Sequence, residues 1–435
     1  MISVIFPVIK HFHKTTTENT LNVALLFFHE SERTSMPNIL QFQRSQKQNS
    51  HDSAEKHPHL VTFVIITKNR PRMVIRLIKS VIKAKLNFFS LVLIDDSDPS
   101  NFLQTNSFLQ SLSTPFKQFS SRQAVGLVEE NLKEINLPEI KESFIRSCAG
   151  VHSPFCGYVE RFLGVYKPMS RRLADIGLRF APYSSARNLG IYCAVRFFDP
   201  EAIFFLDDDC LIINPDKLGD QIRLIETRLN QRRVVALAGL YKDLQISSDS
   251  EKQISGKAMD ILRGMKRFLR ESFTTGETRF EIMPPHMLGG ALVLAKEVFH
   301  ALPFDPYVAR GEDHAYALDL WSCLGRNRIV VRDNDFRVGH QRVMPREQRN
   351  LNVLRDIFRF IYIRAKTGRS FITFFSLRWG FASLIGLVLK PSNYRIYKDE
   401  LWALLFVAPK FTKENASKFG RNVDAWKHFL RMLRR

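Results

Sequence analysis

The stretch Ala202-Ile203-Phe204-Phe205-Leu206-Asp207-Asp208-Asp209 carries the strongest structural signal in this sequence. Five apolar residues that lead directly into three acids are typical of a buried strand that ends at a polar site. Three adjacent ionised carboxylates repel one another and are not left uncompensated in a core. The segment therefore predicts a strand whose carboxyl end binds a divalent cation such as Mn²⁺ or Mg²⁺. A solvent-exposed acidic turn is the alternative.

Two more strands are predicted upstream, joined by a helix. Residues 61–66 form a β-branched run that ends at Thr67-Lys68-Asn69-Arg70, and Pro71 suits the first turn of the following helix. Residues 91–94 form the second run, which ends at Asp95-Asp96. Strand, helix and strand in this order predict a right-handed βαβ unit. Ligands of open α/β sheets bind beyond the carboxyl ends of the strands, where these polar residues fall.

The alternation of helices and strands continues through the centre of the chain. The pattern predicts a helix at residues 185–195, strands at 234–240 and 288–294, a helix from 312 to about 324, and a strand at 329–331. Gly289 and Gly290 open one of these strands and allow a ligand to approach the backbone closely. Residues 99–180 are hard to assign; we interpret 125–128 as a strand and the remainder as an insertion.

Two pairs of acids have both a chemical and a structural interpretation. Asp95 or Asp96 can accept a hydrogen bond from a uracil imide or a ribose hydroxyl, or it can cap a turn. Glu312 and Asp313 open a predicted helix, where one acid is an ordinary cap. A second acid beside it suits a general base that deprotonates a sugar hydroxyl.

Three further polar residues stand at element ends. Arg187 and Asn188 lie at the start of a predicted helix, where they grip phosphate or simply cap the helix. His340 follows a predicted strand, and a lone histidine is more often structural than a metal ligand. By themselves, these residues leave both interpretations open.

Taken in order, the elements resemble the GT-A fold, and most closely the inverting family-two glycosyltransferases. The resemblance covers about residues 60–345, and the elements that carry it are Thr67-Lys68-Asn69-Arg70-Pro71, Asp95-Asp96-Ser97, Ala186-Arg187-Asn188-Leu189-Gly190, the Asp207-Asp208-Asp209 form of the DxD motif, Gly289-Gly290 and Glu312-Asp313, with His340 downstream. It implies an α/β fold with a Rossmann-like, mostly parallel sheet flanked by helices. The implied activity is transfer of a sugar from a nucleotide diphosphate donor, taken as a UDP-sugar, to a hydroxyl of a glycan or lipid-linked acceptor.

The resemblance also implies a role for each matching residue. Asp313 would be the catalytic base, with Glu312 beside it. Asp207, Asp209 and His340 would hold Mn²⁺ or Mg²⁺, while the triplet leaves the role of its middle acid unassigned. The implied nucleotide-sugar contacts are Thr67, Asn69, Arg70, Asp95, Asp96, Arg187, Asn188, Asp207, Asp208, Gly289 and Gly290.

The two ends of the chain differ in charge. The formal net charge is +21, and residues 351–435 carry seventeen Lys and Arg against five Asp and Glu. Residues 346–435 therefore predict a helical, basic region that meets an anionic partner. The apolar window at 371–389 contains Arg378, which favours an in-plane helix on an anionic membrane over a spanning helix. A helix pair packed on the core is the alternative.

Composition bears on the N-terminal segment, the cellular compartment and the rival functions. Residues 1–59 predict a flexible leader rich in His, Gln and Ser. Five cysteines in no metal-binding spacing indicate a reducing, cytoplasmic location, with peripheral attachment to the membrane as a further expectation. A catalytically inactive binding or scaffold protein of the same fold is the main rival. A nucleic-acid-binding protein is less well supported, because no basic stripe with interleaved aromatics occurs in the core region.

Overall fold

The computed structural model describes residues 61–86, 88–133, 182–225, 227–243, 279–282, 287, 289–308, 310–325, 327–340, 346–367, 404 and 408–433. The predicted leader at residues 1–59 and the apolar window at 371–389 lie outside these residues.

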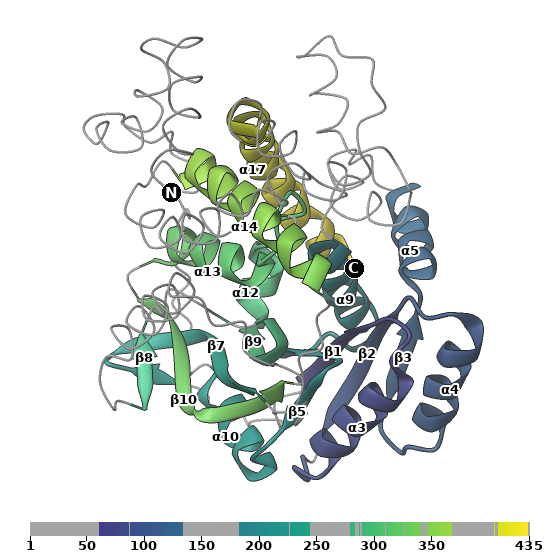
Figure 1. Ribbon diagram of the computed structural model, residues 1–435. Coiled ribbons are helices and arrows are strands. Elements are labelled where there is room, and N and C mark those ends of the chain that lie inside the picture. The colour runs from purple at the N-terminus through teal and green to yellow at the C-terminus, as the bar shows by residue number, and fades with distance from the viewer. Residues whose placement is uncertain are drawn as a thin grey trace, which may run out of the picture.

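The described strands form one mixed sheet with a parallel half (Figure 1). Strand β1 (Val61–Thr67) pairs in parallel with β2 (Phe89–Asp95) on one side and with β4 (Ala202–Asp207) on the other. The order along the sheet is β3-β2-β1-β4-β9-β7-β10-β5. The predicted βαβ unit is confirmed, with α3 (Pro71–Ile82) as its crossover helix. The polar ends of β1, β2 and β4 therefore share one edge of the sheet.

The second half of the sheet mixes strand directions. Strand β9 (Leu292–Ala295) runs antiparallel between β4 and β7 (Arg232–Asp243). Strand β10 (Arg328–His340) is parallel to β7, and β5 (Cys210–Ile212) pairs with its last residues. The short strands β6 (Arg228–Leu229) and β8 (Phe280–Ile282) pair with β7 and β10. The predicted strand at 288–294 begins only at Leu292, because Gly289–Ala291 forms a 3₁₀ turn, η3.

The prediction of a strand at residues 125–128 is wrong. These residues lie in helix α5 (Ser121–Lys133), whose face of Ala124, Val128 and Leu132 is buried. Four apolar residues in a polar setting have no clear period, so sequence could not separate helix from strand here. The preceding residues are also part of the fold: α4 (Pro99–Gln110) leads into β3 (Phe116–Phe119), which pairs with β2. Helix α4 and strand β3 therefore lie within the stretch that was interpreted as an insertion.

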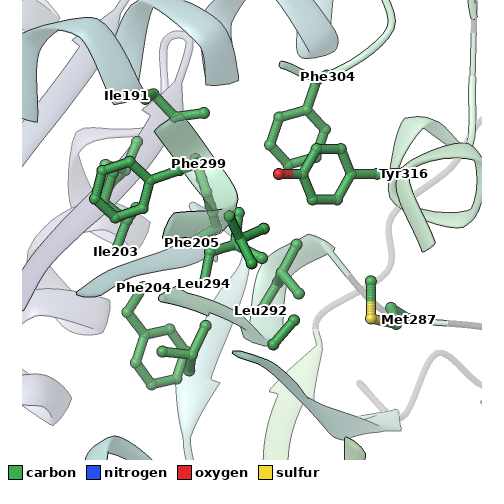
Figure 2. Packing of buried hydrophobic residues seen from close by; sticks show 14 of the residues in the cluster. Ile191, Ile203, Phe204, Phe205, Met287, Leu292, Leu294, Phe299, Phe304 and Tyr316 are labelled. Carbon is green, nitrogen blue, oxygen red and sulfur yellow. The ribbon is translucent and has the colours of Figure 1, made fainter. Parts of the chain in front are cut away.

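Helices cover both faces of the sheet. Helix α9 (Pro182–Phe198), with α12 (Lys296–Ala301) and α13 (Glu312–Cys323), lies above the sheet in Figure 1, and α3 with α10 (Leu218–Leu224) lies below. Phe204 and Phe205 are neighbours on β4 and face opposite sides (Figure 2). Phe204 stacks on Phe63 at 5.3 Å, and Phe205 meets Phe304 edge-on at 5.3 Å. The acid triplet thus follows a strand anchored in the core on both faces.

The described C-terminal helices pack on this core. Helix α17 (Ala408–Met432) contacts α14 (Arg346–Thr367) and α12. Trp426 of α17 is fully buried and donates a hydrogen bond of 2.9 Å to the carbonyl of Phe299, and Phe429 stacks on Tyr192 at 5.8 Å. Among the described helices, none is both long enough and apolar enough to cross a membrane. For these helices, packing on the core is the observed arrangement.

A buried ion cluster ties α14 to the segment around α13. Lys366 Nζ lies 2.6 Å from Asp305 Oδ2 and 2.7 Å from Asp319 Oδ2. The Tyr362 hydroxyl donates a third hydrogen bond, of 2.8 Å, to Asp305. Burial raises the pKa of Asp319 to about 6, although Lys366 opposes the shift. One lysine therefore balances two buried carboxylates.

Replacing this lysine should destabilise the fold. We expect Lys366→Met to lower the free energy of unfolding by about 3–5 kcal/mol, because two carboxylates then lie buried without a cation. Without the cation, the pKa of Asp319 rises further above its unfolded value, so the folded state binds extra protons. Stability should then recover as the pH falls, and the loss should be smaller at about pH 5 than at about pH 8. Urea denaturation measures both values, with exposed Lys410→Met as the control.

Candidate active site

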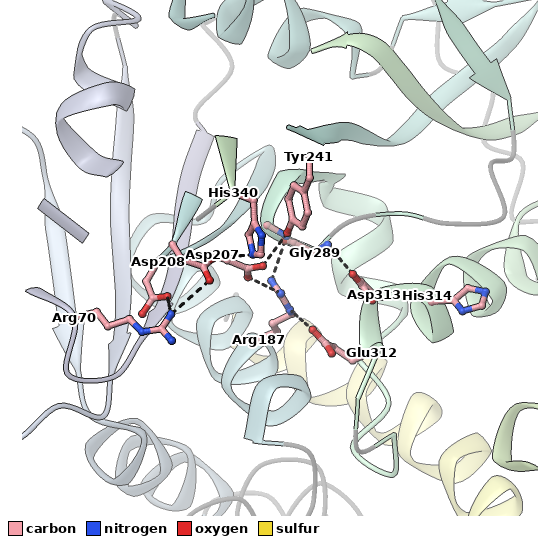
Figure 3. Close-up of polar contacts among 12 residues, drawn as sticks. Arg70, Arg187, Asp207, Asp208, Tyr241, Gly289, Glu312, Asp313, His314 and His340 are labelled. Atoms are coloured by element: carbon pink, nitrogen blue, oxygen red, sulfur yellow. Dashed lines mark hydrogen bonds and ion pairs between the residues drawn. The ribbon is translucent and has the colours of Figure 1, made fainter. Parts of the chain in front are cut away.

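Asp207, the last residue of β4, and Asp208, which follows it, face different environments (Figure 3). Asp207 accepts hydrogen bonds of 2.9 Å from Arg187 Nη2 and from the Tyr241 hydroxyl. Asp208 is buried and accepts 2.9 Å hydrogen bonds from Thr67 Oγ1 and Arg70 Nη1. Burial raises the pKa of Asp208, while Arg70 and Thr67 oppose that shift. Asp208 therefore ties the turn to the end of β1.

Asp207 and Asp209 form the part of the triplet that can hold a metal. One ligand atom each from Asp207, Asp209 and Cys210 lie within 4.8 Å of one another, and Nε2 of His340 lies 3.3 Å from Asp209 Oδ1. The Cys210 thiol is a poor ligand for a hard ion, because burial raises its pKa well above the usual range and keeps it protonated. His340 is outside this group of three, but its imidazole lies beside Asp209 and is the more suitable donor chemically.

The donor set fits the predicted ion. Two carboxylates and one imidazole suit Mn²⁺, and Mg²⁺ is served by the carboxylates. His340 Nδ1 is buried and finds no hydrogen-bond partner among the described residues, so the imidazole is not committed to the protein through that atom. The residues present are therefore compatible with a divalent ion held by Asp207, Asp209 and His340.

Arg187 connects the triplet to the acids of α13. Its side chain is 3 % exposed, and its three nitrogens donate to Asp207, to Glu312 and to the carbonyl of Gly289 at 2.9, 3.2 and 3.0 Å. Its pKa is raised by the neighbouring carboxylates in spite of burial, so the side chain stays charged. Arg187 was predicted to lie near the diphosphate. In the structure its guanidinium binds Asp207, Glu312 and the Gly289 carbonyl together.

The two acids at the start of α13 are not equivalent. Glu312 is 8 % exposed and pairs with Arg187, and burial raises its pKa. Asp313 is partly exposed and accepts a 3.0 Å hydrogen bond at Oδ2 from the Gly289 N–H. Gly311 precedes both with φ of +69°, and a Cβ there would collide with Arg359 of α14. Asp313 is therefore the carboxylate that a substrate can reach.

Tyr241 is a site residue that sequence reasoning missed. Its hydroxyl donates to Asp207 and accepts a 2.8 Å hydrogen bond from the Gly290 N–H. Its ring stacks on His340 with centroids 4.7 Å apart. Burial raises the Tyr241 pKa well above the usual range, so the hydroxyl remains a donor. The sequence did contain one indication of this role: Tyr241 comes one residue after the predicted strand at 234–240, and that strand ends at the same sheet edge as the acids.

The loops after β1 and β2 also meet, as predicted. Asn69 has φ of +55°; its Oδ1 accepts a 2.7 Å hydrogen bond from the Asp98 N–H, and its own N–H donates to Ser97 Oγ. Asp95 is fully buried and accepts from the Ser97 N–H and from Gln118 Nε2. These contacts fix the shape of both loops next to the triplet.

Asp96 differs from Asp95 in exposure. Its two oxygens accept 2.7 Å hydrogen bonds from the N–H and the hydroxyl of Ser121, at the start of α5. Asp96 is nevertheless exposed, whereas Asp95 is not. Of the two acids predicted to meet a base, Asp96 is the one that faces solvent.

Asn188 was predicted to contact the nucleotide sugar, and in the structure its amide is engaged with the protein backbone. Its side chain is fully buried, and its amide exchanges two hydrogen bonds with the backbone of Phe304, at 2.8 and 2.9 Å. Asn188 therefore fixes the chain ahead of α13. Its neighbour Arg187 points into the site from the same helix turn, so adjacency in sequence did not distinguish the two.

Comparisons with known proteins give a loose similarity of fold. No protein-family model matches the chain, and no curated protein matches it. Mannosyltransferase PcManGT from Pyrobaculum calidifontis, solved with GDP-Man and Mn²⁺, is 10% identical with a TM-score of 0.41, and the match covers 84% of this chain and 86% of that chain. S. aureus TarS is 12% identical with a TM-score of 0.40, covering 86% and 91%.

A third solved structure is similar over a shorter stretch. Glucosyl-3-phosphoglycerate synthase from Mycobacterium tuberculosis, in complex with Mn²⁺, UDP and phosphoglyceric acid, is 12% identical with a TM-score of 0.34. The match covers 68% of this chain and 77% of that chain. These scores describe the general course of the chain, so the function rests on the residues of the site.

Proposed function

We propose that this protein is a metal-dependent glycosyltransferase that moves a sugar from a nucleotide diphosphate donor, with UDP-sugar as the proposed donor. The proposed acceptor is a hydroxyl of a glycan or lipid-linked molecule. One observation carries the proposal: a divalent-ion donor set and a reachable carboxylate, Asp313, lie on either side of the Gly289-Gly290 turn. Such a pairing suits a reaction in which one group leaves as an anion and another loses a proton.

The nucleotide would bind over the ends of β1 and β2. Thr67, Asn69 and Arg70 lie at the first strand end, and the exposed Asp96 lies at the second. Ligands of α/β sheets bind at this edge. The diphosphate would then extend toward Asp207 and Asp209, which come from the neighbouring strand β4.

In the proposed reaction, negative charge develops on the departing diphosphate and the acceptor hydroxyl loses a proton. An ion held by Asp207, Asp209 and His340 would offset the negative charge that grows on the departing diphosphate. The bond from the anomeric carbon breaks, and its electron pair leaves with the nucleoside diphosphate. Asp313 accepts the proton of the acceptor hydroxyl while that oxygen attacks from the opposite face, which inverts the anomeric centre. Arg187 holds Asp207 and Glu312 in place.

Binding of nucleoside diphosphates tests the donor class. Isothermal titration of the full chain should detect UDP with Mn²⁺ present and weaker binding, by about tenfold or more, after the ion is removed. ADP, GDP and CDP define the base preference. Equal affinity with and without the ion would contradict a shared ion, and failure of every nucleotide to bind would overturn the proposal.

A further inference from the structure

The 3₁₀ turn at Gly289–Ala291 joins the proposed base to the proposed metal site. The Gly289 N–H donates to Asp313 Oδ2 at 3.0 Å, and the next N–H, of Gly290, donates to the Tyr241 hydroxyl at 2.8 Å. That hydroxyl in turn donates to Asp207 Oδ2 at 2.9 Å. Figure 3 shows this chain of contacts. Two successive backbone N–H groups therefore connect two carboxylates with different proposed roles.

Close packing leaves the turn little freedom to move by itself. A Cβ atom on Gly290 would lie 2.6 Å from Asp207 Oδ2 and would collide with the Tyr241 hydroxyl. A Cβ atom on Gly289 would collide with Arg187, which also donates to the Gly289 carbonyl at 3.0 Å. Since the turn is buried and leads directly into β9, a shift of Asp207 would be transmitted along it.

Tyr241 is the side chain that joins Asp207 to the Gly289-Gly290 turn. Its hydroxyl has one proton, which goes to Asp207, and it accepts the Gly290 N–H with a lone pair. Its ring stacks on His340 with an interplanar angle of 4°. One side chain thus contacts two of the proposed ion ligands and the turn that holds Asp313.

We propose that Tyr241 is a positioning residue that couples occupancy of the metal site to the position of Asp313 through the Gly289-Gly290 turn. The proposal rests on the proposed function for the assignment of the ion and the base. Filling the metal site fixes Asp207, Tyr241 transmits its position to the turn, and the turn sets Asp313 for the acceptor hydroxyl. Asp313 is then correctly placed only when the metal site is occupied.

A double-mutant cycle on Mn²⁺ affinity tests the coupling without requiring activity. The dissociation constant would be measured by electron paramagnetic resonance for wild type, Tyr241→Phe, Asp313→Ala and the double variant; alanine removes the acceptor of the Gly289 N–H. We expect Asp313→Ala to weaken Mn²⁺ binding in the wild-type background, and this loss of affinity should be about three to ten times larger than the loss it causes in the Tyr241→Phe background. Phenylalanine retains the ring beside His340 and removes only the hydroxyl.

The outcomes separate this coupling from other effects. An equal effect of Asp313→Ala on Mn²⁺ affinity in both backgrounds would show direct charge interaction alone and overturn the proposal. Tyr192→Phe removes another buried tyrosine hydroxyl, one that donates to the Leu127 carbonyl, and should leave the Mn²⁺ affinity unchanged. If the wild type binds no Mn²⁺, the proposed function fails together with the coupling; if it binds Mn²⁺ with additive effects, the coupling alone fails.

Kinetics provide a second readout that a general loss of stability would not reproduce. Tyr241→Phe should lower kcat for nucleotide release at saturating Mn²⁺, while KM for the donor stays within about twofold. The pH profile of kcat should also change, since the carboxylate of Asp313 would no longer be held at one position. A rise in KM with an unchanged kcat would contradict a role in positioning the base.

Discussion

Asp313→Asn should lower the rate of sugar transfer by about 10²-fold or more while nucleoside diphosphate affinity stays within a few-fold. Asparagine has the same shape, and its carbonyl oxygen can still accept the hydrogen bond that the Gly289 N–H donates to Asp313. It cannot accept the proton of the acceptor hydroxyl. Initial rates with saturating donor, together with calorimetric titration of the nucleotide, measure the two quantities.

Two further variants test whether the loss of rate comes from removing the base itself. Asp424→Asn removes an exposed carboxylate, 75 % exposed, on α17 and should change neither quantity. Glu312→Gln removes the partner of Arg187 and should impair ion binding as well as rate, because Arg187 also holds Asp207. Equal losses of rate and nucleotide affinity in Asp313→Asn would rule out its assignment as the base.

Asp209→Asn should abolish ion-dependent activity through loss of the ion itself. Removing a ligand should weaken Mn²⁺ binding by at least about a hundredfold, since even the partners of metal ligands contribute ten- to a hundredfold. Electron paramagnetic resonance of bound Mn²⁺ measures the affinity directly. Nucleotide release should fall with it and recover partly at high Mn²⁺ concentration.

The neighbouring acid provides a matched control. Asp208→Asn makes the same chemical change one residue away, but Asp208 faces Thr67 and Arg70. We expect its Mn²⁺ affinity to stay within a few-fold of wild type and its free energy of unfolding to fall, since buried hydrogen bonds to a charged group contribute about 1.5–3 kcal/mol. Similar losses of Mn²⁺ affinity in both variants would contradict the separate roles within the triplet.

The parts of the fold that sequence predicted best are those with an unambiguous pattern of apolar residues. Strands β1, β2 and β4 are continuous apolar runs that end in polar residues, and both features are visible without a structure. Strand β3 is partly exposed at the sheet edge, and its Phe-Lys-Gln-Phe has no such run. Helix α5 was taken for a strand because only one short apolar stretch stood out.

For the site, too, some features were visible in the sequence and others were not. Asp207 was predicted because parallel strands bring their carboxyl ends together, whereas a role for His340 was implied only by the resemblance to family-two glycosyltransferases. The direction of each side chain was not predictable, since it depends on packing that sequence does not contain. Arg187 and Asn188 are adjacent on α9, yet one points to the acids and the other clamps the backbone of Phe304. Tyr241 was missed for the same reason.

The role of the C-terminal region depended on long-range contacts. Its positive charge is evident from sequence, but the pairing of Lys366 with Asp305 and Asp319 is not. Those contacts link α14 to the helix that begins with Glu312 and Asp313. Helix α14 therefore belongs to the framework that supports the proposed base.

Release of nucleoside diphosphate from a panel of nucleotide sugars, followed by chromatography, tests the proposed activity most directly. With Mn²⁺ and no added acceptor, we predict that the wild type slowly hydrolyses at least one donor. This release should stop on addition of a chelator and be lost in Asp209→Asn. If nucleotides bind but no donor releases nucleotide above the uncatalysed rate, even with candidate glycan and lipid-linked acceptors present, the protein is a binding protein and the proposed activity is wrong.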